Sequence, residues 1–274
     1  MNIKMKKLFV LLGVSLVVAI GFCGCGKEAE ARAKVEAERT IALSNGVQLK
    51  MIRVEPGSFM MGSENGYSDT KPVHQVTLTK PYYLGETEVT QAQWRAVMGY
   101  NPSHFQRDSR PVEVVSWHDA MEFCQKLNDA GLAPSGWKFT LPTEAQWEFA
   151  ARGGNKSKGY EYSGSNNVED VAWSKSNSGD ETHAVRQKQA NELGLYDMGG
   201  NVLEWCLDGE RRYSSSAVTD PQGPQGGSDR VWRGGSWDTY ATNAEFCYSG
   251  FRSSSDPNYR DDSCGFRLAL VPVQ

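Results

Sequence analysis

Residues 191–205 read NELGLYDMGGNVLEW, a stretch that combines paired glycines with an apolar ending. Gly199 and Gly200 indicate positions where the backbone adopts a positive φ angle or where another chain segment packs closely, since glycine has no Cβ atom. Trp205 ends the stretch within an apolar run, so we expect it to anchor the core rather than to contact a substrate. The stretch is therefore expected to contribute to the folded framework, and by itself it indicates no catalytic function.

Three helices are predicted before this stretch, over residues 90–99, 116–131 and 143–153. Each begins at a Thr or Ser that can cap the first turn and ends at a glycine. In the second helix apolar residues recur at helical spacing, which places Cys124 on the core side. Three more tryptophans in apolar stretches are expected to be core anchors, namely Trp94, Trp117 and Trp147.

Short strands and long loops make up the rest of the predicted domain. Strand-like pieces cover residues 51–63, 74–89 and 230–237. Residues 155–181 and 209–229 are rich in Gly, Ser, Asn, Asp and Pro, which is typical of surface loops. The sequence thus predicts one loop-rich α+β domain over residues 46–274.

Composition argues against nucleic acid as a partner. The chain has 274 residues and a net charge of -4, and no run of Lys or Arg follows its N-terminus. Nucleic-acid binding normally needs a basic face, because the ligand is a polyanion. We therefore expect no nucleic-acid partner.

The N-terminal residues 1–25 are interpreted as a lipoprotein signal peptide. Three lysines precede an apolar run over residues 8–20, which is too short to span a bilayer comfortably. Cys25 follows a glycine and is the expected lipid acceptor, whereas Cys23 follows a bulky Phe; ordinary cleavage without a lipid is the alternative. Residues 26–45 would then be a charged tether. The predicted location is exported and membrane-anchored, at the outer membrane or cell surface.

Cysteine and histidine patterns indicate no catalytic or zinc site. The chain after residue 25 contains four cysteines: Cys124, Cys206, Cys247 and Cys264. Export permits a disulfide between them, but their pairing cannot be deduced from the sequence. Neither a CxxC pair nor a Cys/His spacing typical of zinc occurs, and the four histidines are scattered. Nucleophile-elbow, P-loop and HExxH motifs are also absent.

Seven segments in a fixed order resemble the formylglycine-generating-enzyme, or sulfatase-modifying-factor, family between about Met51 and Leu270. They are VEPGSFMMGS, ETEVTQAQW, RPVEVVSWHDAMEFC, LPTEAQWEFAARGG, NELGLYDMGGNVLEW, RVWRGGSW and GFRLAL. The resemblance implies a C-type lectin-like fold of the formylglycine-generating subtype, with a small sheet, packed helices and extensive loops.

The family's oxidases use two cysteines separated by four residues to bind copper(I), which prefers soft thiolate ligands. Aligning Arg252 with the corresponding family arginine puts Ala244 and Ser249 at those two positions. Aligning Cys247 with the first cysteine puts Arg252 at the second. We therefore predict that the chain is not an enzyme; a formylglycine-generating-type oxidase or sulfatase-modifying enzyme is the alternative.

One metal site is implied by the resemblance. The segment GNVLEW is similar to the one in which the family holds a structural calcium ion, with Asn201 and Glu204 as side-chain oxygen ligands. The alternative is that both side chains cap or bridge neighbouring loops. No other cofactor is expected.

The C-terminal part, from about residue 230 to residue 270, alternates fixed-looking residues with gaps of a restricted alphabet. Every gap residue is Asp, Thr, Tyr, Ser or Asn, and all five can be reached from an Asn codon by changing only its adenines. The gaps are Asp238, Thr239, Tyr240, Ser253, Ser254, Ser255, Asp256, Asn258, Tyr259, Asp261, Asp262 and Ser263, with Tyr248 as a further candidate. This pattern resembles the variable region of proteins diversified by retroelements through adenine-directed mutation.

The resemblance implies a surface-displayed lipoprotein that binds ligands through diversified loops and performs no chemistry. Tyr240 and Tyr259 are the expected anchors, because Tyr offers large contact area with few torsions to immobilise. Four gap residues are aspartates and favour a basic or polar partner. The partner would be an unidentified protein or cell-surface ligand, and the N-terminal lipid would bind the membrane. A purely structural envelope lipoprotein is a third interpretation.

Overall fold

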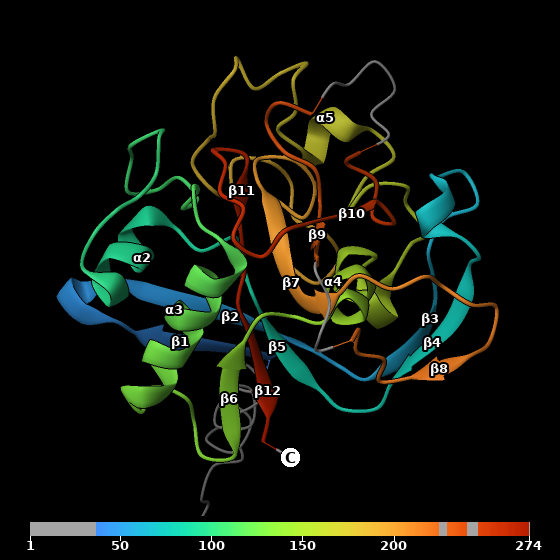
Figure 1. Ribbon diagram of the computed structural model, residues 1–274, viewed down its shortest axis with the longest axis horizontal. Helices are drawn as coiled ribbons and strands as arrows, with labels where there is room; N and C mark the ends of the chain where they lie inside the picture. Colours follow the sequence, from blue (N-terminus) through green and yellow to red (C-terminus); the bar gives the residue numbers. More distant parts are fainter. Residues whose placement is uncertain (1–36, 225–228, 240–245, 274) are drawn as a thin grey trace, which may run out of the picture. The chain divides into compact units, whose positions relative to one another are not determined.

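The computed structural model describes residues 37–224, 229–239 and 246–273 (Figure 1). The predicted signal peptide, its lipid acceptor Cys25, most of the tether, Tyr240 and Ala244 lie outside these residues. The described residues form an α+β fold with three sheets, in agreement with the predicted fold class.

The largest sheet has five antiparallel strands. Its order is β1 (Glu38–Ala42), β2 (Gln48–Val54), β5 (Tyr82–Gly85), β12 (Ala269–Pro272) and β6 (Trp137–Thr140). The fold therefore brings its last strand into the middle of a sheet built mainly from its first third. All four residues of β5 are buried, as expected for a central strand.

Two smaller sheets complete the domain. The four-stranded sheet has the order β10 (Arg252–Ser255), β9 (Arg230–Arg233), β7 (Leu203–Gly209) and β11 (Cys264–Gly265). The three-stranded sheet has the order β3 (Gly57–Met61), β4 (His74–Leu78) and β8 (Val218–Thr219). Strand β10 lies at an edge, because β9 is its only partner strand.

The three predicted helices are confirmed as α2 (Gln91–Met98), α3 (Trp117–Asp129) and α4 (Glu144–Ala151). Each begins with a capping box, in which the cap side chain and the third helical residue satisfy each other's backbone N–H groups. The loops after α4 contain the short elements η3 (Gly154–Lys156) and α5 (Val168–Val171). Two further 3-10 turns are η1 (Ser44–Gly46) and η2 (Ser68–Thr70).

The core confirms most of the predicted anchors. Trp94, Trp147 and Trp205 have no exposed surface, and Cys124 is buried on the inner side of α3. Trp117 differs, because it is only partly buried and donates its indole N–H to the Cys206 carbonyl. Its position at the first turn of α3 places it at the rim of the core rather than inside it.

The paired glycines behave as the sequence predicted. Gly200 has a φ angle of 75°, and a side chain there would collide with the Trp173 carbonyl. Gly199 lies against the Cys247 carbonyl, which leaves little space for a Cβ atom. The stretch is therefore scaffold, and Leu203 and Trp205 continue it into β7.

Two predicted boundaries need correction. Strand β1 and η1 lie within residues assigned to the tether, so the domain begins near Glu38 instead of residue 46. The predicted strand over residues 51–63 is interrupted before Gly57 and forms parts of β2 and β3. The four cysteines described are free and buried thiols. No helix of the described residues is long and apolar enough to cross a membrane.

Candidate binding surface

Two fixed-looking arginines of the C-terminal segment, Arg252 and Arg233, are buried in ion pairs. Arg252 binds the Glu144 carboxylate through Nε at 2.6 Å and Nη2 at 3.2 Å. Arg233 binds Glu144 at 3.2 Å and Glu148 at 2.6 Å. Burial alone would raise the pKa of Glu144, but the charges of Arg252 and Arg233 lower it. These contacts tie β9 and β10 to helix α4.

Arg267 forms a second buried pair, with Glu204. Its Nε and Nη2 atoms lie 2.6 and 2.7 Å from the two Glu204 oxygens. Nη2 also donates to the carbonyl oxygens of Tyr196 and Asp197. The Gly-Phe-Arg segment thus fastens the end of the chain to the NELGLYDMGGNVLEW stretch.

The loop between β10 and β11 is attached to the start of α3 by fixed-looking residues. The Pro257 carbonyl accepts the Trp117 N–H at 3.1 Å, and Arg260 binds both oxygens of Asp119 at 2.8 and 3.0 Å. The Asp261 carbonyl accepts the Val114 N–H at 3.0 Å. Two of these contacts use the backbone, so they hold the loop without depending on variable side chains.

The three predicted variable serines form most of β10. Ser253, Ser254 and Ser255 are half-buried and pair with β9. Of these three serines, Ser254 forms a side-chain hydrogen bond within the described residues, of 2.9 Å, to the exposed Glu210. Within the described residues β10 is an edge strand, a position in which one side of the backbone has no partner strand.

A tight turn follows β10 and presents three predicted variable residues. The Asp256 carboxylate accepts from the N–H and the side-chain amide of Asn258 at 2.7 and 3.0 Å. These hydrogen bonds lower the pKa of Asp256. Tyr259 is 43% exposed, and its ring packs edge-on against Trp232 with centroids 5.7 Å apart. Tyr259 is therefore an exposed aromatic side chain, and its role as an anchor stays a prediction.

An acidic group lies next to this turn. Asp262 is near Asp261 and Asp238, and burial together with their charges raises its pKa. The Asp262 carbonyl accepts the Trp237 indole N–H at 3.1 Å, while its carboxylate lies 3.3 Å from His104 Nδ1. The arrangement brings residues from two separate gaps of the sequence onto one acidic surface.

Thr239 belongs to the same region but faces its own turn. Its hydroxyl accepts the Ser236 N–H at 2.8 Å, while the Ser236 hydroxyl donates to Asp238 at 2.9 Å. We call the described residues of these gaps, apart from Ser263, the C-terminal face. It comprises Asp238, Thr239, Ser253, Ser254, Ser255, Asp256, Asn258, Tyr259, Asp261 and Asp262.

Two predicted variable residues do not point to solvent as expected. Ser263 is 9% exposed because its N–H and hydroxyl bind the Asp261 carboxylate, and its carbonyl accepts the Leu203 N–H. Tyr248 is also 9% exposed, because its ring packs against Phe251. It lines a cavity of about 510 Å³ that no other predicted variable residue lines. Neither residue belongs to the C-terminal face.

The sequence did not single out the aromatic residues beneath the C-terminal face. Trp232 lies under Tyr259, and Trp237 holds the Asp262 backbone. Both occur in the RVWRGGSW segment, which was interpreted as frame alone. His104, from the loop between α2 and α3, also contacts the face. Nothing near His104 in the sequence indicated this contact, because it depends on the path of a distant loop.

The residues predicted for calcium are engaged within the protein. Asn201 accepts the His183 N–H at 2.9 Å and donates to Glu88 at 2.8 Å. Glu204 faces the Arg267 guanidinium, which already neutralises its charge. These contacts are those of the alternative interpretation, in which both side chains bridge loops, and they fit a divalent cation poorly.

Calcium at this place therefore stays a prediction. Within the described residues, no group of three or more His, Cys, Asp or Glu side chains is arranged to hold a metal ion. One buried oxygen beside Glu204, Asp197 Oδ1, has no hydrogen-bond partner, so it would bind such an ion more readily than Asn201. Comparing melting temperatures in calcium and in a chelator tests the prediction.

The two positions that correspond to the family's copper-binding cysteines hold other residues in this chain. Ser249, at one of the family's two cysteine positions, is fully buried, and Ala244 lies outside the described residues. Burial raises the pKa of Cys247 to about 12 and raises the pKa of Cys264 as well. Both thiols are therefore neutral near pH 7 in the metal-free protein.

Comparison with known proteins agrees with this fold. Residues 41–271 match the family described as the sulfatase-modifying factor enzyme 1-like domain. The chain belongs to this family. Its fold is the C-type lectin-like fold of the formylglycine-generating subtype, with the segment order that the sequence predicted.

Individual relatives of this sulfatase-modifying factor domain carry names that indicate different roles. Chaperone protein LppX from Paenibacillus barcinonensis is 36% identical, over 73% of this chain and 82% of that protein. Formylglycine-generating enzyme from Mus musculus is 32% identical, over 72% of this chain and 53% of that enzyme. Among solved structures, Treponema denticola variable protein 1 has a TM-score of 0.77 and 35% identity, over 86% of this chain and 99% of that one.

Proposed function

We propose that this protein binds ligands through the C-terminal face, that a retroelement diversifies this face, and that the protein performs no chemistry. The similarity to a protein named a variable protein, over 99% of that protein's length, supports this function.

One observation carries the proposal: the frame and the gap residues make different kinds of contact. Arg252, Arg260 and Arg267 bind carboxylates more than 60 positions away in the chain. Most gap side chains instead bind groups two or three positions away, as Asp256 binds Asn258. Replacing a gap residue therefore removes little that holds the fold together, whereas replacing a frame residue leaves a charge without its partner.

The face also has the chemistry of an adaptable paratope. Tyr259 supplies exposed aromatic area, and the Ser and Asn residues supply hydrogen-bonding groups that suit many partners. Asp238, Asp261 and Asp262 give this copy an acidic face, so the partner is a protein or cell-surface ligand with a basic or polar surface.

Display at the cell surface completes the proposal. Residues 1–25 have the lysines, apolar run and Gly-Cys ending of a lipoprotein signal peptide, with Cys25 as lipid acceptor and the following residues as tether. Labelling cells with radioactive palmitate tests this anchor. Cys25→Ala should abolish the label and Cys23→Ala should keep it, whereas the reverse result would contradict the assignment.

The binding function is tested with two displayed libraries. The first varies Asp238, Asp256, Asn258, Tyr259, Asp261 and Asp262 among Asp, Asn, Ser, Thr and Tyr. The matched control varies six exposed positions of the loop over residues 155–181 with the same alphabet. Selection on lysozyme, a basic protein, should yield binders from the first library at least tenfold more often. Equal yields would remove the special role of the C-terminal face.

Diversification and catalysis each have a separate test. A near-copy of the last coding segment with adenines at the gap codons, beside a reverse-transcriptase gene, is expected in the genome. Absence of both would contradict diversification while leaving binding intact. Oxygen consumption with a cysteine-containing peptide and copper should equal the background without protein, and turnover would favour the oxidase alternative.

A further inference from the structure

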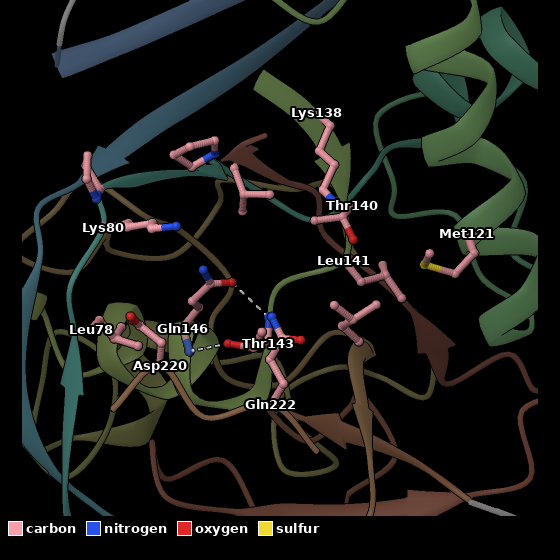
Figure 2. A pocket seen from close by; sticks show the side chains of 14 residues that line it. Leu78, Lys80, Met121, Lys138, Thr140, Leu141, Thr143, Gln146, Asp220 and Gln222 are labelled. Carbon is pink, nitrogen blue, oxygen red and sulfur yellow. Dashed lines mark hydrogen bonds between the residues drawn. The ribbon is translucent and has the colours of Figure 1, made fainter. Parts of the chain in front are cut away.

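A pocket of about 480 Å³ lies apart from the C-terminal face, at the N-terminal end of α4 (Figure 2). Its walls come from β6, the end of β12, the corner between β4 and β5, and the loop that follows β8. None of the predicted variable residues lines it. We call it the α4 pocket; its volume is within the range of small-molecule sites.

Aliphatic side chains form much of the wall of the α4 pocket. They are Leu78, Pro81, Leu141, Leu207, Val271 and Pro272. Their surfaces favour a ligand with an apolar body, because binding would remove apolar area from water on both sides.

Two lysines give the pocket a positive charge. Lys80 lines it from the corner between β4 and β5 and Lys138 from β6; both are exposed, and no ion pair joins either of them to the described residues. The only carboxylate in the lining, Asp220, accepts hydrogen bonds from the Thr79 N–H at 2.8 Å and from the Thr79 hydroxyl. Asp220 keeps its negative charge, so two lysines and one aspartate leave the pocket with a net positive charge that attracts an anion.

Gln146 adds a donor whose orientation is fixed by helix capping. Its Oε1 accepts the Thr143 N–H at 2.9 Å, which completes the capping box of α4. The amide must therefore direct its Nε2 group away from the helix end. Figure 2 shows this nitrogen on the side of the pocket where the Lys80 ammonium lies. Donors thus outnumber acceptors in the polar part of the pocket.

We infer that the α4 pocket binds a small amphipathic carboxylate, of the class of medium-chain fatty acids. The carboxylate lies between Lys80, Lys138 and the Gln146 amide, and the hydrocarbon chain packs against Leu78, Leu207 and the end of β12. A neutral ligand would gain nothing from the charge of the two exposed lysines, and a small inorganic anion would leave the apolar walls exposed. This site is independent of the C-terminal face.

Calorimetric titration of the full chain with sodium decanoate, below its micelle concentration, tests the inference. Affinity should rise about fourfold for each methylene from hexanoate to decanoate, since each buried CH₂ contributes a constant free energy. Decanol should bind at least tenfold more weakly than decanoate. No binding of decanoate at millimolar concentration, or equal binding of decanol, would overturn the inference.

Gln146→Glu is the sharpest variant. Glu can also accept the Thr143 N–H, so the capping box and the melting temperature are preserved, but the donor becomes an anion. Decanoate affinity should fall at least tenfold, and Lys80→Gln/Lys138→Gln should have a similar effect. Lys126→Gln, on the outer surface of α3, is the matched control and should change affinity less than twofold. Unchanged affinity in Gln146→Glu would refute the assignment.

The same titration distinguishes a free acid from a bilayer lipid. Vesicles of phosphatidylglycerol should not compete with decanoate, because the pocket holds one short chain. Competition by vesicles at equal lipid concentration would assign the pocket to a membrane surface and overturn the small-molecule assignment.

Discussion

Arg252 and Ser253 are adjacent in β10 and contribute very differently to the fold. Arg252 is 3% exposed, and its guanidinium donates hydrogen bonds to both Glu144 carboxylate oxygens. Ser253 is half-buried, and its side chain forms no hydrogen bond within the described residues. The alternation of side chains along a strand allows one residue to face the core and the next to face a ligand. A diversified strand needs this division, because each variable position must be free to change.

Arg252→Met should therefore lower the free energy of unfolding by about 3 kcal/mol or more, since it leaves Glu144 buried with less compensation. Ser253→Asn should change it by less than about 0.5 kcal/mol. Denaturant unfolding of both variants measures the contrast. If Ser253→Asn cost as much as Arg252→Met, the separation of frame from variable residues would fail.

Asp208 allows a test of how burial changes the pKa of a single carboxyl group. It is fully buried, and burial together with the Glu144 charge raises its pKa from 3.8 to about 6. Because the pKa of Asp208 is higher in the folded than in the unfolded state, its contribution to the free energy of unfolding is complete below pH 3.8. That contribution is lost as the pH rises through 6. Asp208→Asn removes this pH dependence. The Asn amide has one oxygen instead of two, so it cannot accept from the Glu144 and Gly223 N–H groups as the two carboxylate oxygens do.

The stability difference between Asp208→Asn and the unchanged protein should therefore shift in favour of the variant by up to about 3 kcal/mol between pH 4 and pH 7.5. Denaturant titrations at several pH values measure it, with Asp129→Asn on the surface of α3 as the control. A constant difference over this range would contradict the raised pKa.

The elements differ in how far the sequence could predict them. The helices α2, α3 and α4 were predictable because a capping box is a local signal. Strands β10 and β11 were not, because their pairing with β9 and β7 depends on distant parts of the chain. The sequence also could not show that Glu144 and Glu148 are buried, since charged residues in a helix usually face solvent.

The loop between β10 and β11 is the element on which binding depends, and Arg260 holds it to α3. The Arg260 side chain is 46% exposed, so Arg260→Gln should cost less than about 1 kcal/mol of global stability. Locally, the N–H groups of Trp117 and Val114, which bind the loop carbonyls, should exchange with solvent several times faster.

Hydrogen exchange read by mass spectrometry or NMR tests this prediction. Arg95→Gln is the matched control, because Arg95 in α2 is as exposed as Arg260, pairs with the exposed Asp108 and does not touch the loop. Unchanged exchange at Trp117 in Arg260→Gln would show that the backbone contacts hold the loop without the ion pair.

The whole domain is organised so that sequence-distant ends meet in one sheet. Strand β12, near the C-terminus, pairs with β5 and β6, and β1 pairs with β2 at the edge of the same sheet. Resemblance to a family predicted this fold class and the location of the C-terminal face. It did not predict β1, because the resembling segments begin only at about Met51, although residues 40–43 (TIAL) are less polar than the preceding part of the tether.

Two truncations decide where the domain begins. A chain starting at residue 37 keeps β1, the buried Leu43 and the Glu38–Lys50 ion pair of 3.0 Å, so it should unfold cooperatively with nearly the full melting temperature. A chain starting at residue 47 loses the burial of Ile41 and Leu43, worth about 2–3 kcal/mol, and exposes β2 as a new edge. Its melting temperature should fall by about 5–10 °C in calorimetry. If both chains melted together, β1 would contribute nothing and the domain would begin at residue 46.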